Sequence, residues 1–170
     1  MLNRRHFLQC VVAAAATPSL LTAGHARVPT AGARDLVADA RRILDLAPGL
    51  DYTVVSRYGD PMNDGLRVPG AHDGMAAFPG ENGRIRLVCN HELKPVSADA
   101  SAFADTYGNL PDDVRERFYD RGEDATPGPG GTTTTIFNPA TGETERQFLS
   151  LAGTETNCAG GPTPWGSWLS

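Results

Sequence analysis

The sequence has a single lysine, Lys94, and it lacks the short motifs on which several enzyme classes depend. There is no Gly-x-Ser-x-Gly elbow for a serine nucleophile, no His-Glu-x-x-His zinc motif and no glycine-rich phosphate loop that ends in lysine. Hydrolases that rely on these motifs, serine-based phosphatases among them, are therefore excluded.

Positive charge is scarce, with 15 lysines and arginines against 20 acidic residues and a net charge of −5. Removal of an N-terminal segment that carries Arg4 and Arg5 but no acid would lower this charge to −7. Such a chain gains nothing from counterion release on DNA or RNA, so nucleic acid is not an expected partner. The acidic residues either serve hard cations or form an ordinary solvated surface.

Aromatic residues make up only 7% of the 170 residues, whereas there are 19 glycines and 13 prolines. This composition favours one small, loop-rich domain over a helical bundle. Of the three cysteines, Cys10 lies in the N-terminal apolar segment, so Cys89 and Cys158 leave one disulfide at most.

Residues 1–26 have the order of features expected of an export signal. Arg4 and Arg5 precede an alanine-rich apolar stretch of about a dozen residues, too short to span a bilayer, and Ala26 ends a small-residue cleavage site. The opening resembles the twin-arginine signature, which implies a folded, often metal-loaded protein delivered to the periplasm or secreted by the twin-arginine machinery, with no stable membrane anchor. The alternatives are a short uncleaved anchor or a buried alanine-rich helix.

The mature sequence predicts mainly β structure with a short helix or two. Helices are expected at 35–46 and 111–119, and strands at 52–56, 75–78, 84–89, 132–137 and 143–151. Turn residues at 79–83 and 138–142 join the last four strands in pairs, which gives a four-stranded antiparallel meander with one insertion. A sheet of this kind is one blade of a β-propeller, with 165–169 as the start of the next; a small sandwich or an isolated meander is the alternative.

Three segments, residues 59–78, 87–92 and 157–169, resemble the PhoX-type alkaline phosphatase family. The most specific is 157–169, which reads Asn-Cys-Ala-Gly-Gly-Pro-Thr-Pro-Trp-Gly-Ser-Trp-Leu. The resemblance implies that residues 27–170 are a partial β-propeller domain from an exported phosphomonoester hydrolase. It also implies iron and calcium ions at the mouth of the central channel as cofactors.

The same resemblance implies roles for four side chains. Cys158 would be an iron thiolate ligand, Glu92 and Asp73 would bind metal, and His91 would contact the phosphate of the substrate. Each role has a structural alternative. Cys158 could form a disulfide with Cys89 or simply be buried, and Asp73 could belong to a turn. His91 and Glu92 could form a surface strand end in which the histidine has its hydrogen bonds satisfied.

Two weaker features complete the set of candidate residues. Asp60, Asn63 and Asp64 have the side chains of a calcium loop without its twelve-residue frame, and Trp165 and Trp168 are expected to pack within a blade.

Because family members continue beyond the Trp-Gly-Ser-Trp segment into further acidic ligands, we expect this chain by itself to hold little tightly bound iron and to have negligible phosphatase activity. The competing interpretation is a non-enzymatic exported propeller or scaffold that binds calcium. A third is a propeller hydrolase of lactonase type, which needs no cysteine ligand.

Overall fold

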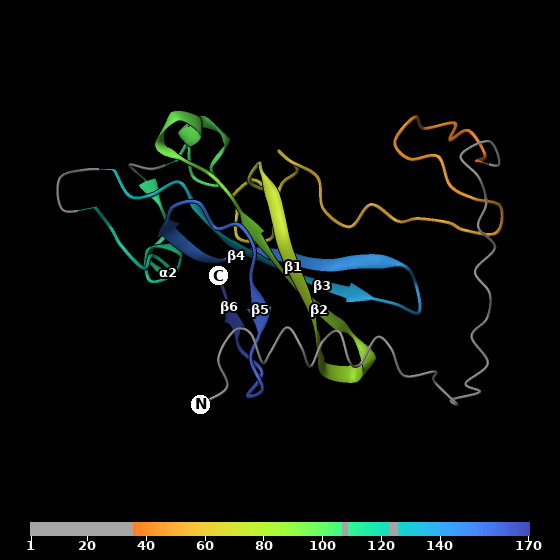
Figure 1. Ribbon diagram of the computed structural model, residues 1–170. Helices are drawn as coiled ribbons and strands as arrows, with labels where there is room; N and C mark the ends of the chain where they lie inside the picture. Colours follow the sequence, from red (N-terminus) through yellow and green to blue (C-terminus); the bar gives the residue numbers. More distant parts are fainter. Residues whose placement is uncertain (1–35, 107–108, 123–125) are drawn as a thin grey trace, which may run out of the picture. The chain divides into compact units, whose positions relative to one another are not determined.

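The computed structural model describes residues 36–106, 109–122 and 126–170 (Figure 1). The expected export signal, residues 1–26, lies outside these ranges. The chain divides into two compact units between Asp51 and Tyr52.

Residues 36–51 form an irregular loop, so the predicted helix at 35–46 is wrong. Val37 pairs with Leu46 in an isolated antiparallel bridge. Between them, the carboxylate of Asp39 accepts hydrogen bonds from the backbone N–H groups of Ile43 and Arg41 at 2.9 and 3.0 Å. A side chain that takes up backbone donors in this way competes with the helical hydrogen bonds.

The second unit is built on a four-stranded antiparallel sheet in the order β1-β2-β3-β4, which confirms the predicted meander. The strands are β1 (His72–Pro79), β2 (Ile85–His91), β3 (Gly130–Asn138) and β4 (Glu143–Thr154). The turn η1 (Glu81–Gly83) joins β1 to β2, at the position given by the predicted turn residues. The sheet is open among the described residues, and its assignment to a propeller blade stays a prediction.

The predicted strand at 52–56 is wrong, because these residues have no regular secondary structure. Residues 55–64 instead run beside β4, and we call them the edge segment. Its first contact is a 3.0 Å hydrogen bond from Thr144 Oγ1 to the carbonyl oxygen of Val55. A long-range side-chain contact, which local propensity does not encode, therefore fixes this part of the chain.

At the far end of the edge segment, side-chain oxygens accept backbone N–H groups of β4, as the carbonyl groups of a neighbouring strand would. The N–H of Gln147 donates to Asn63 Oδ1 at 2.7 Å, and the N–H of Asn63 donates to the Gln147 carbonyl at 2.9 Å. Asp64 Oδ2 accepts the N–H of Leu149 at 2.8 Å. Asn63 and Asp64, which had the residue types of a calcium loop, thus tie the loop to the sheet.

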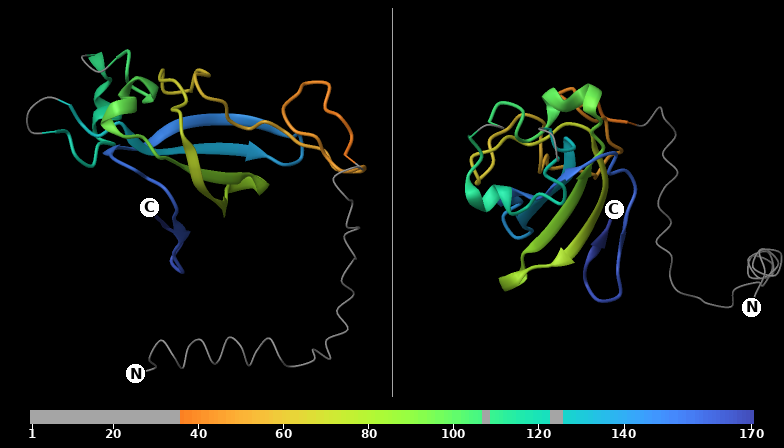
Figure 2. Two further views of the ribbon diagram at one scale, coloured as in Figure 1. Left: turned by 45° about the horizontal axis from the view of Figure 1, so that its top comes forward. Right: turned by 90° about the vertical axis from the view of Figure 1, so that its left-hand side faces the viewer.

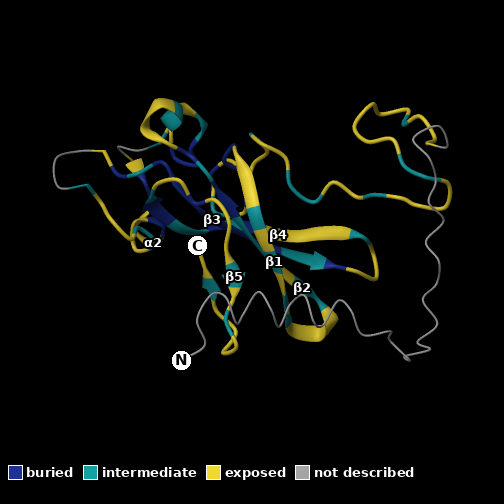
Figure 3. Ribbon diagram, viewed as in Figure 1, coloured by how far each residue is buried: buried dark blue, intermediate teal, exposed yellow. Residues whose placement is uncertain are grey.

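The insertion between β2 and β3 covers one end of the sheet and contributes to the core (Figure 3). It contains η2 (Pro95–Ala100) and α2 (Asp112–Arg115), so the helix predicted at 111–119 is only four residues long. The core combines apolar side chains of the insertion with those of the loop that precedes β1 and of β4: Met62, Leu66, Val68, Ala102, Phe103, Leu110, Val114, Leu149 and Ala152.

The C-terminal residues form a separate two-stranded hairpin, β5 (Gly161–Pro162) with β6 (Trp168–Leu169), and do not add a strand to the main sheet (Figure 2). Trp165 at its tip is 78% exposed, so the packing expected of it is not formed in this structure, whereas Trp168 is half-buried. Among the described residues, no helix has the length and apolar character needed to cross a membrane.

Candidate metal centre

Asp73 and Glu92 come together because β1 and β2 are antiparallel neighbours. Asp73 follows the first residue of β1 and Glu92 follows the last residue of β2, where His72 pairs with His91. The pairing shifts register between His72 and Met75, which places an irregularity at Asp73 and Gly74. Irregularities of this kind re-aim side chains at the ends of strands. The two carboxylates therefore lie at one end of the sheet.

Cys158 reaches the same place from the loop that follows β4. The N–H of Gly74 donates to the carbonyl oxygen of Cys158 at 3.3 Å, which brings this loop beside β1. The side chains of Asp73, Glu92 and Cys158 each offer a ligand atom, and these atoms lie within 4.8 Å of one another. The structure thus gathers the three residues that the sequence proposed as metal ligands; their binding of an ion stays a prediction.

The electrostatics of this cluster favour a cation. A hydrogen bond to the carboxylate of Asp73 raises the pKa of the Cys158 thiol, and the negative charges of Asp73 and Glu92 raise that pKa further. Without a cation the thiol therefore keeps its proton. A divalent ion between the three groups would offset the repulsion and displace that proton, as metal binding does at thiolate sites.

The donor set fits a transition metal better than calcium. A thiolate is a soft ligand that suits iron or zinc, whereas calcium takes oxygen ligands. Asp73 and Cys158 are exposed and Glu92 is half-buried, so solvent can reach the cluster. Among the described residues, this is the one group of three such side chains close enough to share an ion.

Cys89 and Cys158 are both free thiols, so the disulfide considered as an alternative is not formed. Cys89 is half-buried in β2, and burial raises the pKa of its thiol. Its sulfur lies 3.3 Å from the carbonyl oxygen of Asn90 and 3.9 Å from that of Asp73. Cys158, which is exposed, is the more accessible thiol.

His91 is buried, with 1% of its surface exposed, and both of its ring nitrogens have protein partners. Nδ1 lies 2.8 Å from the carbonyl oxygen of Gly70, and Nε2 lies 2.9 Å from Thr133 Oγ1. A carbonyl can only accept, so Nδ1 carries the proton and the neutral Nε2 accepts from the threonine hydroxyl. This is the satisfied-histidine alternative; a contact between His91 and substrate stays a prediction that would require these bonds to open.

The burial of His91 makes the folded chain sensitive to acid. Desolvation lowers the pKa of His91 from 6.5 to about 4. The unfolded chain therefore binds more protons between these values, and the stabilisation present above pH 6.5 is lost as the pH falls toward 4. We expect a loss of about 3 kcal/mol in the free energy of unfolding across this window.

Urea unfolding at pH 7.5 and at about pH 4.5 measures this effect. His91→Gln removes the titrating group, so the variant should be less stable at pH 7.5 but should lose less stability on acidification than the unsubstituted chain. Equal losses in the two proteins would contradict the assignment to His91.

Gly74 is placed where a side chain would push the Cys158 loop away. A Cβ atom at this position would lie 2.8 Å from the Cys158 carbonyl oxygen and 3.2 Å from Ala159 Cα. We expect Gly74→Ala to cost about 1–3 kcal/mol of stability, as overpacking typically does, and to weaken metal binding by displacing Cys158. Gly161→Ala is the matched control, because nothing lies within 4 Å of a Cβ there. Urea unfolding and cobalt titration should separate the two variants, and identical behaviour would contradict the close approach.

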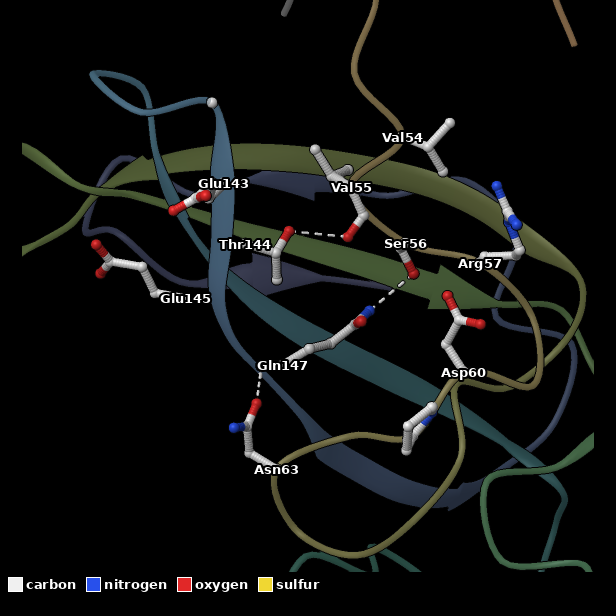
Figure 4. Close-up of a pocket in the computed structure, with 12 residues that line it drawn as sticks. Val54, Val55, Ser56, Arg57, Asp60, Asn63, Glu143, Thr144, Glu145 and Gln147 are labelled. Carbon is white, nitrogen blue, oxygen red and sulfur yellow. Dashed lines mark hydrogen bonds between the residues drawn. The ribbon is translucent and has the colours of Figure 1, made fainter. Parts of the chain in front are cut away.

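A cavity lies at the end of the sheet opposite the cluster (Figure 4). The register shows the separation, since His91 pairs with Gly131 at one end of β3 while Phe137 pairs with Thr144 at the other. This cavity of about 710 Å³ is formed by the edge segment and the start of β4. In Figure 4, Ser56 and Asn63 point toward Gln147, to which they hydrogen-bond, so these polar groups hold the wall together.

Two residues beside the cluster were missed by sequence reasoning. Asn90 is fully buried, and Gly74 approaches the Cys158 backbone. Both residues lie in the segments that carry the family resemblance. Alternation along a strand, however, indicates only which face of the sheet a side chain occupies. No sequence signal states which distant segment that face will meet.

Residues 31–170 match the family model described as alkaline phosphatase PhoX. No curated protein and no solved structure shows a significant match to the chain.

Proposed function

We propose that this chain, which belongs to the alkaline phosphatase PhoX family, supplies metal ligands to an exported phosphomonoester hydrolase. The observation that carries the proposal is the convergence of Asp73, Glu92 and Cys158, whose ligand atoms lie within 4.8 Å of one another. These side chains come from three separate segments, so their meeting is a property of the fold.

Cys158 would hold iron through its thiolate, and the carboxylates of Asp73 and Glu92 would complete this chain's share of an iron and calcium centre. Metal ions at such a centre supply the positive charge that offsets the negative charge of phosphate oxygens during hydrolysis.

The chain's own residues would prepare that centre. The carboxylate of Asp73 accepts a hydrogen bond from the Cys158 thiol, so it holds the sulfur beside the other ligands in the metal-free chain. His91 anchors the strand end that carries Glu92, through its bonds to Gly70 and Thr133. A ligand on an anchored strand end loses less freedom when it binds an ion.

Export by the twin-arginine route is part of the proposal, with the periplasm or the exterior as the place of action. It rests on Arg4, Arg5 and the apolar run that follows them. The non-enzymatic calcium-binding scaffold is less favoured, because a thiol beside two carboxylates adds nothing to a calcium site.

The test is hydrolysis of p-nitrophenyl phosphate by protein loaded with iron and calcium. We expect a rate that falls to background in EDTA and returns when the metals are restored. The assay is run on the 170-residue chain and on any longer natural form of the protein. Hydrolysis that is unaffected by EDTA, or its absence from every metal-loaded form, would refute the proposed function.

A further inference from the structure

Asn90 links the Cys158 loop to the C-terminal hairpin. Its side chain is fully buried. The Nδ2 group donates to the carbonyl oxygen of Cys158 at 2.6 Å, and Oδ1 accepts from Trp168 Nε1 at 2.8 Å. One amide thus joins two segments that lie 68 and 78 residues further along the chain.

The two partners fix the orientation of this amide. A backbone carbonyl can only accept a hydrogen bond and an indole N–H can only donate one. The site therefore needs one donor and one acceptor on the same short side chain. Aspartate would place an oxygen against the Cys158 carbonyl, and leucine would remove the hydrogen bonds that Asn90 makes to both partners.

The carbonyl of Cys158 is held from both strands that carry the carboxylates. Gly74, next to Asp73 on β1, donates to it from one side, and Asn90, two residues before Glu92, donates to it from the other. A shift of this carbonyl would move the thiol relative to both carboxylates. Its position is therefore tied to the distances within the cluster.

Trp168 carries this restraint into the hairpin. It pairs with Pro162 across β5 and β6, and its ring lies against Gly160, where a Cβ atom would overlap the indole. The loop that bears Cys158 and the hairpin are thus packed together around the indole.

We propose that Asn90 is a positioning residue that sets the Cys158 thiol for metal binding, and that Trp168 fixes Asn90 in turn. This inference rests on the proposed metal-binding function. It predicts that removal of the Asn90 amide or of the Trp168 indole N–H weakens metal binding, although the three ligand residues are unchanged.

Cobalt(II) titration of the full chain, with Cys10→Ser in every protein, tests the inference through the sulfur-to-cobalt charge-transfer absorption. We expect Asn90→Ala and Trp168→Phe each to weaken cobalt affinity by roughly 10–100-fold, the effect typical of lost outer-shell partners. Trp165→Phe is the matched control, because this residue is on the same hairpin but exposed, and its cobalt affinity should equal that of the parent chain.

Amide hydrogen exchange of residues 155–169 in the metal-free chain provides a second readout. Exchange should quicken in Asn90→Ala and Trp168→Phe and stay unchanged in Trp165→Phe. Cobalt affinity equal to that of the parent chain in both variants, or a lower thermal stability with unaltered exchange and affinity, would overturn the role of Asn90. Absence of the charge-transfer absorption from the parent chain itself would overturn the proposed metal site instead, so the two failures are distinguishable.

Discussion

Cys158→Ala is expected to abolish the sulfur-to-metal absorption of the cobalt-loaded chain. The substitution removes the one thiol in the cluster while Asp73 and Glu92 stay in place. Two carboxylates without a soft donor bind a transition metal poorly, so affinity should fall by more than the roughly 10–100-fold that follows loss of an outer-shell partner. In a form that holds iron, bound iron should disappear as well.

Cys89→Ser is the control for this experiment, because Cys89 is the other free thiol among the described residues and lies outside the cluster. Its absorption and affinity should match those of the unsubstituted chain. Absorption that survives in Cys158→Ala and vanishes in Cys89→Ser would reassign the sulfur ligand, and an unchanged iron content in Cys158→Ala would contradict the proposed centre.

Asp64→Ala is expected to destabilise the fold by about 2–4 kcal/mol, because it removes a charged acceptor from a partly buried ion pair and from a backbone N–H. The side chain of Asp64 is 5% exposed. Its Oδ2 accepts from Arg117 Nη1 at 2.9 Å and from the N–H of Leu149 at 2.8 Å. The substitution would leave a guanidinium and a backbone N–H without this acceptor, at the junction of the edge segment, the insertion and β4.

Asp113→Ala provides a matched control with the same arginine. Asp113 accepts from Arg117 Nη2 at 2.8 Å, but its side chain is 69% exposed. Exposed pairs contribute about 0–1 kcal/mol, so this variant should unfold at nearly the parent urea concentration. Equal destabilisation by the two substitutions would show that burial of Asp64 does not decide the outcome.

The four-stranded meander was predictable because its turns are encoded locally. Pro79–Gly83 and Asn138–Gly142 combine proline, asparagine and glycine between runs of strand-forming residues, and the two antiparallel pairs form around them. Two other local patterns gave wrong elements. The helix expected at 35–46 gave way to a loop held by Asp39, and the strand expected at 52–56 is held by side chains of β4 instead of a strand ladder.

The residue types of the candidate site could be named from the sequence, but their meeting could not be derived from it. Asp73 and Glu92 lie together because of one strand register, which includes an irregularity at the start of β1. Cys158 joins them only through a loop whose backbone bonds to Gly74 and Asn90. Those contacts depend on packing between distant segments, and no local pattern reports it.

The edge segment also bears on how copies of this chain behave at high concentration. Asn63 and Asp64 occupy backbone groups of Gln147 and Leu149 on β4. In an uncovered edge strand these groups would be available to a strand from another molecule, which is the first step of β-sheet aggregation. Association through this stretch therefore requires the edge segment to detach first, so Asn63 and Asp64 also protect the β4 edge from pairing with another molecule.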